Sequence, residues 1–143
     1  MSNKSESKNK IARAYGKELK ISPKHSVEIC NFIKGMLVSD AKRVLEDVVA
    51  LKRPIPYKKY KRKLAHRRDL QGWYAGRYPV KAATHILRLL KDAEANAAYK
   101  GLNTEKLRII HIAASKGRVI KGYRKGMPFN KSTTNIEVIV EEE

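Results

Sequence analysis

Histidine, cysteine and carboxylate side chains are the residues of this sequence that could carry catalysis or hold a metal ion. The chain contains one cysteine, Cys30, and four histidines: His25, His66, His85 and His111. No two histidines have the i, i+4 spacing of a helical metal site, and no carboxylate stands at motif distance from them. Cys30 follows His25 by five residues, which is about 140° around a helix, so the two cannot form a nucleophile pair there.

The carboxylates give no catalytic pattern either. A two-metal nuclease needs clustered carboxylates to hold its ions. The most basic segments contain only Asp69, and the adjacent Glu46 and Asp47 point in different directions on a helix. The sequence also lacks a Walker motif, a GxSxG motif and a Rossmann fingerprint. We therefore expect no metal site, no cofactor and no enzymatic activity.

A first basic segment, residues 52–78, mixes cations with aromatic side chains and has Asp69 as its only acidic residue. Cations suit phosphate groups, and aromatic rings suit base stacking, which is worth about 1 to 3 kcal/mol per base. Trp73 could equally anchor the loop on the core, and the lysines could form a solvated face. The cations and aromatics are Lys58, Lys59, Lys61, Arg62, Lys63, Arg67, Arg68 and Arg77, with Tyr57, Tyr60, Trp73, Tyr74 and Tyr78.

A second basic segment lies between two strand-like apolar runs, LRIIHI (residues 107–112) and IEVIV (residues 136–140). No acidic residue lies between the runs, whereas three glycines do, Gly117, Gly122 and Gly126. This arrangement predicts a long antiparallel hairpin whose base joins the core and whose far end does not. Its cations are Lys116, Arg118, Lys121, Arg124, Lys125 and Lys131.

The overall charge points to a polyanionic partner. Lysine and arginine total 32 against 14 aspartate and glutamate, a formal net charge of +18, and the basic segments are almost free of acidic residues. A merely solvated surface would mix signs, so nucleic acid is the expected partner. No apolar run approaches the roughly 20 residues that span a bilayer, and no signal-peptide core follows the amino terminus. We expect a cytosolic chain with no membrane partner and no small-molecule substrate.

The remaining segments predict the elements that position these groups. Residues 1–10 are expected to be a disordered basic tail, and residues 11–143 a single domain that begins with a strand at residues 11–19. A helix should start at Ser22-Pro23 and stop at Gly35, with Cys30 buried in its apolar pattern. A second helix should begin with Ser39 as N-cap. A third should span residues 79–100, with Pro79 at its first position and Gly101 as its stop.

The arrangement of charge favours RNA over DNA. No predicted helix is basic along one face, so none resembles a recognition helix for the major groove. A basic loop and a basic hairpin that reach in different directions suit the irregular grooves of folded RNA. A regulatory protein that binds duplex DNA and an RNA-processing nuclease remain as alternatives.

Long strings of the sequence resemble a known family. They are ARAYGKELKISPKHSVEICNFIKG (residues 12–35), HRR (66–68) followed by GRYPVKAATHILRLLKDAEANAAYKGL (76–102), and HIAASKGRVIKGY (111–123) with the closing NIEVIVEE (135–142). Together they resemble the L-twenty-two family of large-subunit ribosomal proteins in its archaeal and eukaryotic form (L-seventeen in eukaryotic naming). The resemblance implies an α+β fold, with three helices packed on a three-stranded antiparallel sheet from which a long hairpin extends, here residues 113–135.

The resemblance also implies a function. Members are structural proteins that bind large-subunit rRNA, help it assemble, lie beside neighbouring ribosomal proteins and direct the hairpin tip to the nascent-peptide exit tunnel, where a nascent peptide is an expected contact. The residues that match the family's globular rRNA surface are Arg13, His66, Arg67, Arg68, Arg77 and Tyr78, and those that match its outgoing hairpin strand are Lys116, Arg118, Lys121 and Gly122. Lys131 on the returning strand is expected to bind RNA as well.

The sequence departs from the family at the expected tip, which consists of Arg124, Lys125, Gly126 and Met127. Relatives usually carry a proline-arginine and glycine-arginine-alanine segment there. Here RKG leads directly into MPFN, so the hairpin is expected to be several residues shorter.

Overall fold

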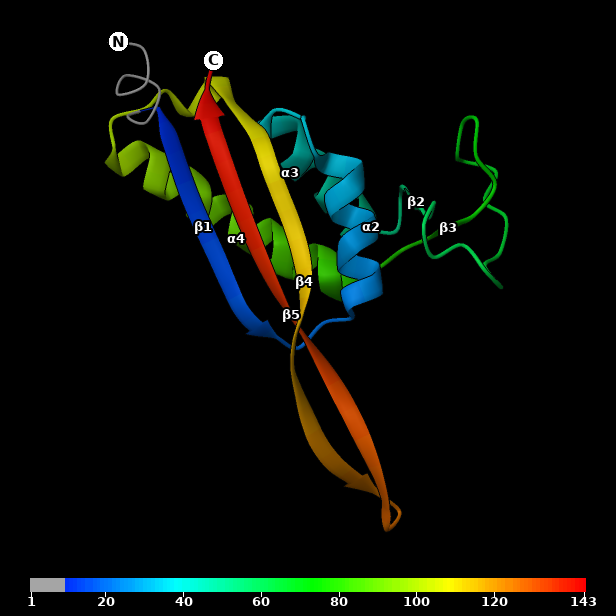
Figure 1. Ribbon diagram of the computed structural model, residues 1–143. Coiled ribbons are helices and arrows are strands. Elements are labelled where there is room, and N and C mark those ends of the chain that lie inside the picture. Colours follow the sequence, from blue (N-terminus) through cyan, green and yellow to red (C-terminus); the bar gives the residue numbers. More distant parts are fainter. Residues whose placement is uncertain (1–9) are drawn as a thin grey trace.

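A computed structural model describes residues 10–143, and the tail predicted at residues 1–10 lies outside the described residues except for Lys10. Strands β1 (Ile11–Leu19), β4 (Leu107–Arg124) and β5 (Met127–Glu142) form an antiparallel sheet in the order β1-β5-β4 (Figure 1). Val138 of β5 pairs with Ala14 on one side and with Ile112 on the other. The last strand in the sequence is therefore the central strand of the sheet.

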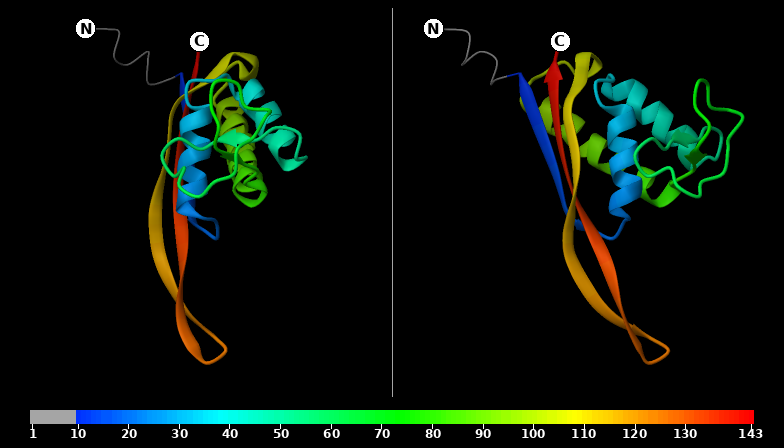
Figure 2. Two further views of the ribbon diagram at one scale, coloured as in Figure 1. Left: turned by 90° about the vertical axis from the view of Figure 1, so that its right-hand side faces the viewer. Right: turned by 45° about the vertical axis from the view of Figure 1, so that its right-hand side comes forward.

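Helices α2 (Pro23–Ile33), α3 (Val38–Val49) and α4 (Val80–Tyr99) lie on one side of the sheet (Figure 2). Helix α4 packs mainly on β1, α2 packs on β4, and α3 packs on α4. The layer between helices and sheet contains fully buried aliphatic side chains such as Ile29, Leu90 and Val138. A short 3₁₀ helix, η1 (Thr104–Lys106), leads into β4. The structure confirms the predicted α+β fold with a long hairpin.

The ends of α2 and α4 lie close to their predicted positions. Helix α2 begins at Pro23 after Ser22, although the Ser22 side chain makes no capping hydrogen bond. Pro79 is the N-cap of α4 rather than its first helical residue. At the other end Gly101 has φ +77°, and the N–H groups of Gly101 and Leu102 donate to the carbonyl oxygens of Ala98 and Ala97. This pattern is a Schellman motif, which explains why the helix stops at the glycine.

Helix α3 begins earlier than predicted, because the N-cap is Leu37 and not Ser39. The backbone just before Leu37 bonds to β4: the N–H of Gly35 donates to the Ile109 carbonyl oxygen (3.0 Å), and the N–H of Ile109 donates to that of Met36 (2.9 Å). Leu37 itself has an extended backbone and forms a bridge with Arg108. The sheet therefore sets the start of α3, and this tertiary contact overrides the local capping preference.

A β-bulge accounts for the continuous apolar run of β4. Ile109 pairs with Val140 and His111 with Ile139, which leaves Ile110 without a partner of its own. Ile110 is 40% exposed, whereas Ile109 and Ile112 are buried. The inserted residue shifts the alternation of inward-facing and outward-facing side chains along β4. Ile109 and Ile112, which are three positions apart, therefore both face the helices.

Beyond the end of β1, strands β4 and β5 continue as a two-stranded hairpin (Figure 1). We call residues 116–120 and 131–134 the hairpin root, where a second bulge interrupts β4 between Lys116 and Val119. A Cβ added at Gly117 would lie 2.6 Å from Thr133 Oγ1, so the root has room only for glycine there. Thr133 Oγ1 donates to the Arg118 carbonyl oxygen (2.5 Å) and Thr134 Oγ1 donates to that of Ile21 (2.8 Å). The Thr133 hydroxyl therefore links the two strands of the root, and the Thr134 hydroxyl links the root to the body.

The cysteine in α2 provides a test of the core. Cys30 is 2% exposed, as predicted, and burial raises the pKa of its thiol to about 12. Because only the thiolate reacts with alkylating reagents, native protein at pH 8 should remain unmodified by iodoacetamide, whereas protein in urea should be modified at once. Mass spectrometry measures this, with Cys30→Ala as the unreactive control. Complete modification without urea within minutes would contradict the buried position.

Candidate nucleic-acid interface

Residues 52–78, which we call the basic loop, form an ordered structure at the side of the helices (Figure 1). Two short strands at its ends, β2 (Ile55–Pro56) and β3 (Gly76–Arg77), pair with each other. Further in, His66 bridges to Ala75, and the N–H of Arg67 donates to the Tyr74 carbonyl oxygen (2.8 Å). The loop is therefore held together by its own backbone hydrogen bonds.

A buried carboxylate fastens the basic loop to α2. Glu28 is 2% exposed, and its two oxygens accept the backbone N–H groups of Lys58 (2.9 Å), Lys59 (2.8 Å) and Tyr60 (2.9 Å). A buried carboxylate is costly unless its oxygens are hydrogen-bonded, and charge-assisted bonds of this kind are stronger than neutral ones. Glu28 thus fixes the backbone from which the cations of residues 58–63 extend.

Tyr57 also belongs to the body, which corrects its inclusion among the stacking aromatics. Its side chain is 1% exposed, and its hydroxyl lies 2.5 Å from Nδ1 of His25. Burial raises the pKa of the Tyr57 hydroxyl. Burial, together with the charge of Arg77, lowers the pKa of His25, so His25 is neutral at pH 7. Tyr57 and His25 therefore form an uncharged hydrogen-bonded pair beneath the basic loop.

Two other aromatics of the loop, Trp73 and Tyr74, cluster with His66. Trp73 stacks on Tyr74 with ring centroids 4.8 Å apart, and Tyr74 lies 5.2 Å from the His66 ring. The Trp73 indole N–H donates to the Tyr57 carbonyl oxygen (2.9 Å), and the Lys61 ammonium lies 5.4 Å from the Trp73 ring centre. Trp73 therefore helps to anchor the loop, which is the alternative to base stacking considered for it above. Tyr74 is 42% exposed, so its ring still has surface available to a base.

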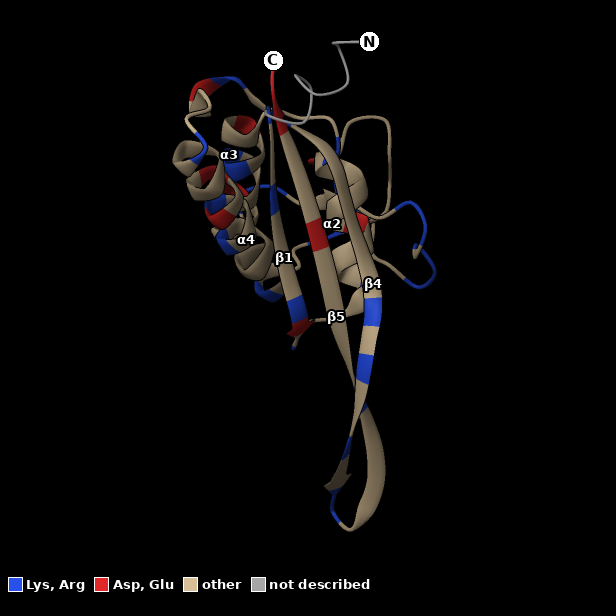
Figure 3. Ribbon diagram, turned by 60° about the vertical axis from the view of Figure 1, so that its left-hand side comes forward, with Lys and Arg blue, Asp and Glu red and all other residues tan. Residues whose placement is uncertain are grey.

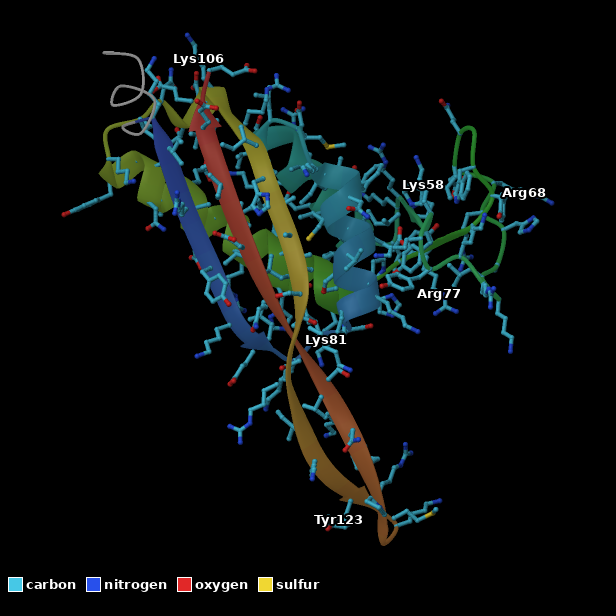
Figure 4. All side chains as sticks on the ribbon, viewed as in Figure 1. Lys58, Arg68, Arg77, Lys81, Lys106 and Tyr123 are labelled. Carbon is cyan, nitrogen blue, oxygen red and sulfur yellow. The ribbon has the colours of Figure 1, made fainter. Side chains whose placement is uncertain are left out.

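Most of the predicted loop cations are exposed. Lys58, Arg68 and Arg77 extend outward from the loop (Figure 4). Arg67 is half-buried: its Nε donates to the Gly76 carbonyl oxygen (3.4 Å) and its guanidinium lies 5.2 Å from the centre of the Tyr78 ring. The other exposed cations are Lys59, Lys61, Arg62 and Lys63. The loop therefore presents many cations from a fixed backbone. The Arg67 guanidinium is the exception, because it already makes contacts within the loop.

The hairpin carries the second group of predicted cations. Its ladder continues to the pair Arg124 and Met127, and Lys125 (φ 51°) and Gly126 (φ 76°) form a two-residue turn. Positive φ at both central residues matches the turn type that suits the twist of a hairpin. The exposed cations are Lys116, Arg118, Lys121, Arg124, Lys125 and Lys131. Figure 3 shows that Lys and Arg occur along the loop and the hairpin, whereas Asp and Glu are concentrated on the body.

The predicted residues do not converge on one site. The loop and the hairpin project in different directions from the body (Figure 1). Arg13 is exposed on β1 and pairs with Ile139, which is part of the sheet and not of either projection. The predicted site residues therefore fall into three separate groups, on the loop, the hairpin and the sheet.

Comparison with known proteins now identifies the family. The profile of the family described as ribosomal protein L22p/L17e matches residues 14–141. The chain belongs to this family. It is 49% identical to the large ribosomal subunit protein uL22 of Archaeoglobus fulgidus over 96% of this chain and 92% of the relative. It is 52% identical to that of Methanopyrus kandleri (93% and 87%) and 50% identical to that of Methanocaldococcus jannaschii (93% and 88%).

Membership of the L22p/L17e family confirms the predicted resemblance and makes the chain a large-subunit ribosomal protein, with the cytoplasmic ribosome as its location. The relatives are structural ribosomal proteins, which supports the prediction that the chain is not an enzyme. Within residues 10–143 no three histidine, cysteine or carboxylate side chains are arranged to hold a metal ion. None of the helices in the same residues is long and apolar enough to cross a bilayer.

Several residues that shape the candidate interface of this chain were not recognised as such from its sequence. Glu28 was not among the predicted site residues, although its place in an apolar stretch beside Ile29 and Cys30 was a signal of burial. Lys20 and Lys81 are exposed beside the hairpin root, and nothing in their local sequence distinguishes them from other surface lysines. Only the fold brings them near the predicted cations.

The role of Glu28 can be tested by Glu28→Gln. The amide keeps one acceptor but turns an NH₂ group toward a backbone donor, so the free energy of unfolding should fall by about 1 to 3 kcal/mol. Urea denaturation measures this, and hydrogen exchange should show faster exchange at Lys58, Lys59 and Tyr60. The control is Glu46→Gln, an exposed carboxylate on α3. Equal stability of the two variants would contradict the assigned role.

Proposed function

We propose that the chain binds large-subunit rRNA through the basic loop and the hairpin. The observation that carries this proposal is the charge of these two projections. The basic loop contains only one acidic residue, Asp69, and residues 113–135 contain none. Their cations are nevertheless exposed on backbones that hydrogen bonds hold in place. Cations without acidic neighbours gain most from a partner that brings its own negative charge.

The proposed mechanism is charge neutralisation at fixed positions. RNA segments repel one another through their phosphates, and cations on the loop and the hairpin reduce this repulsion where the segments meet. Because the loop and the hairpin point in different directions, one protein molecule can join RNA segments that lie on different sides of it (Figure 1). This supports a role in assembling and stabilising rRNA. Neighbouring ribosomal proteins are further proposed partners, since the Archaeoglobus fulgidus relative is named as a protein of the large ribosomal subunit, which implies other proteins beside it.

The proposed binding should depend steeply on salt. If six or more phosphates are neutralised, the affinity for an Archaeoglobus fulgidus large-subunit rRNA transcript should fall by about 10³ or more between 50 and 200 mM salt. Filter binding at several salt concentrations measures the slope. A duplex DNA of equal total charge serves as the comparison and should bind more weakly at every salt concentration. Salt-independent binding, or tighter binding of the DNA, would argue against an rRNA-binding function.

We also propose that the hairpin tip extends toward the nascent-peptide exit tunnel. The hairpin is only two strands wide, about 5 Å between strand axes, and it ends in a two-residue turn. Tyr123 and Met127 beside the turn are 79% and 72% exposed, so the tip packs on nothing within the described chain. A projection this narrow with free cations at its end suits a confined passage lined by RNA, in which Arg124 and Lys125 would meet both RNA and a nascent peptide.

A cross-linking experiment tests the position of the tip. The variant Cys30→Ala/Tyr123→Cys places the only thiol near the tip, and a short thiol-specific photoreactive group on it should cross-link to an arrested nascent chain in reconstituted ribosomes. The control Cys30→Ala/Lys106→Cys places the thiol at the opposite end of the sheet and should give no such product (Figure 4). Gel electrophoresis separates the products. Cross-links from Lys106→Cys alone would reverse the proposed orientation.

A further inference from the structure

A cavity lies between the hairpin root and the body. Its volume is about 660 Å³, and its lining includes Ile120 of the hairpin, the connection from β1 to α2, and the first turn of α4. The hairpin thus forms one wall of the cavity and the body forms the others. Whatever occupies this cavity would touch both parts of the protein at once.

Three lysines from three separate elements line this cavity. Lys20 follows β1, Lys81 is in the first turn of α4, and Lys131 is on the returning strand of the hairpin. All three are exposed, and none of the described residues that line the cavity is acidic. Three lysines with no carboxylate among the described lining residues favour an anion in the cavity, although Glu18 lies in the adjoining pocket, which shares Ile120 and Thr133 with this one.

The backbone of the cavity wall also carries partial positive charge, like the lysine side chains. His25 belongs to the first turn of α2, and Lys81 and Ala82 belong to that of α4, where N–H groups have no partners within the helix. The N–H of Val80 is already used, because it donates to the Tyr78 carbonyl oxygen (2.9 Å). Neither helix has an acidic residue in its first turn. The hydroxyl of exposed Ser132 on the hairpin is a further possible donor. These groups add hydrogen-bond donors to the charge of the lysines.

His25 connects this cavity with a second one. The second cavity, about 440 Å³, lies between α2 and the basic loop, and its cations include Lys24, Lys59, Arg62 and Arg77. His25 lines both cavities. Cations therefore line both of the cavities that share His25, one at the hairpin root and one at the basic loop.

We propose that the cavity at the hairpin root binds a backbone phosphate of RNA and thereby joins the hairpin to the body. This proposal rests on the rRNA-binding function proposed above and names a specific part of the binding surface. The bound phosphate bridges Lys131 on the hairpin and Lys20 and Lys81 on the body. The orientation of the hairpin is then fixed by the RNA as well as by the hydroxyl groups of Thr133 and Thr134.

The test compares two variants with the same net charge. In the first, Lys20, Lys81 and Lys131 are all replaced by Gln; in the control, the exposed Lys34, Lys91 and Lys106 are replaced by Gln. Figure 4 shows Lys81 beside the hairpin root and Lys106 at the far end of the sheet. For the Archaeoglobus fulgidus rRNA transcript at 100 mM salt, the first variant should lose at least tenfold in affinity, and its salt slope should become shallower by about 1, because one phosphate contact is lost. The control should lose less than threefold.

A second measurement uses the unaltered protein, so it does not depend on how the variants fold. RNA should protect Lys20, Lys81 and Lys131 from acetylation at least fivefold more than Lys34, Lys91 and Lys106, as measured by mass spectrometry. Equal losses of affinity in the two variants, or equal protection of the two sets of lysines, would overturn the cavity proposal while leaving rRNA binding intact. Failure of the unaltered protein to bind the transcript would overturn both proposals.

Discussion

Repulsion among the excess cations is the constraint to which the whole structure conforms. A net charge of +18 on 143 residues opposes any compact arrangement in which the cations share one surface. The body avoids this by keeping charge out of its interior, where Glu28 is the single charged residue among the described buried ones. Half of the lysines and arginines, 16 of 32, lie instead on the two projections, which contain only one acidic residue, Asp69. The shape of the molecule thus reduces the repulsion among its cations.

The projections differ in how they are held. The basic loop depends on one carboxylate, three backbone N–H groups and a cluster of aromatic rings, so much of its order comes from side chains. The hairpin depends on a ladder of backbone bonds that continues from the sheet. A loop ordered before binding loses less entropy when RNA arrives, which favours affinity. In the proposed complex with rRNA, the aromatic rings would thus contribute to affinity even where, like Trp73, they are already engaged within the protein.

Elements defined by repeated burial could be predicted from the sequence, because Ala83, Ile86 and Leu90 of α4 recur at helical spacing and face the sheet. The family resemblance predicted how these elements are arranged, with three helices on a three-stranded sheet. Features set by contacts between distant residues could not be predicted. The start of α3 depends on a bond to Ile109, and the acceptor role of Glu28 depends on residues about thirty positions later in the chain. The cations at the cavity were missed for the same reason, since only the packing of the hairpin root against α4 brings Lys81 and Lys131 together.

The bulge at Gly117 gives the hairpin the geometry of a lever. Strand β4 runs uninterrupted from Val119 to Arg124, and with the bulge included the arm measures about 26 Å at roughly 3.3 Å per residue. A rotation of about 10° at the bulge would swing the end of such an arm through roughly 4 to 5 Å, close to the separation of two neighbouring strands. A small change of backbone angle at this bulge would therefore be magnified at the far end of the hairpin.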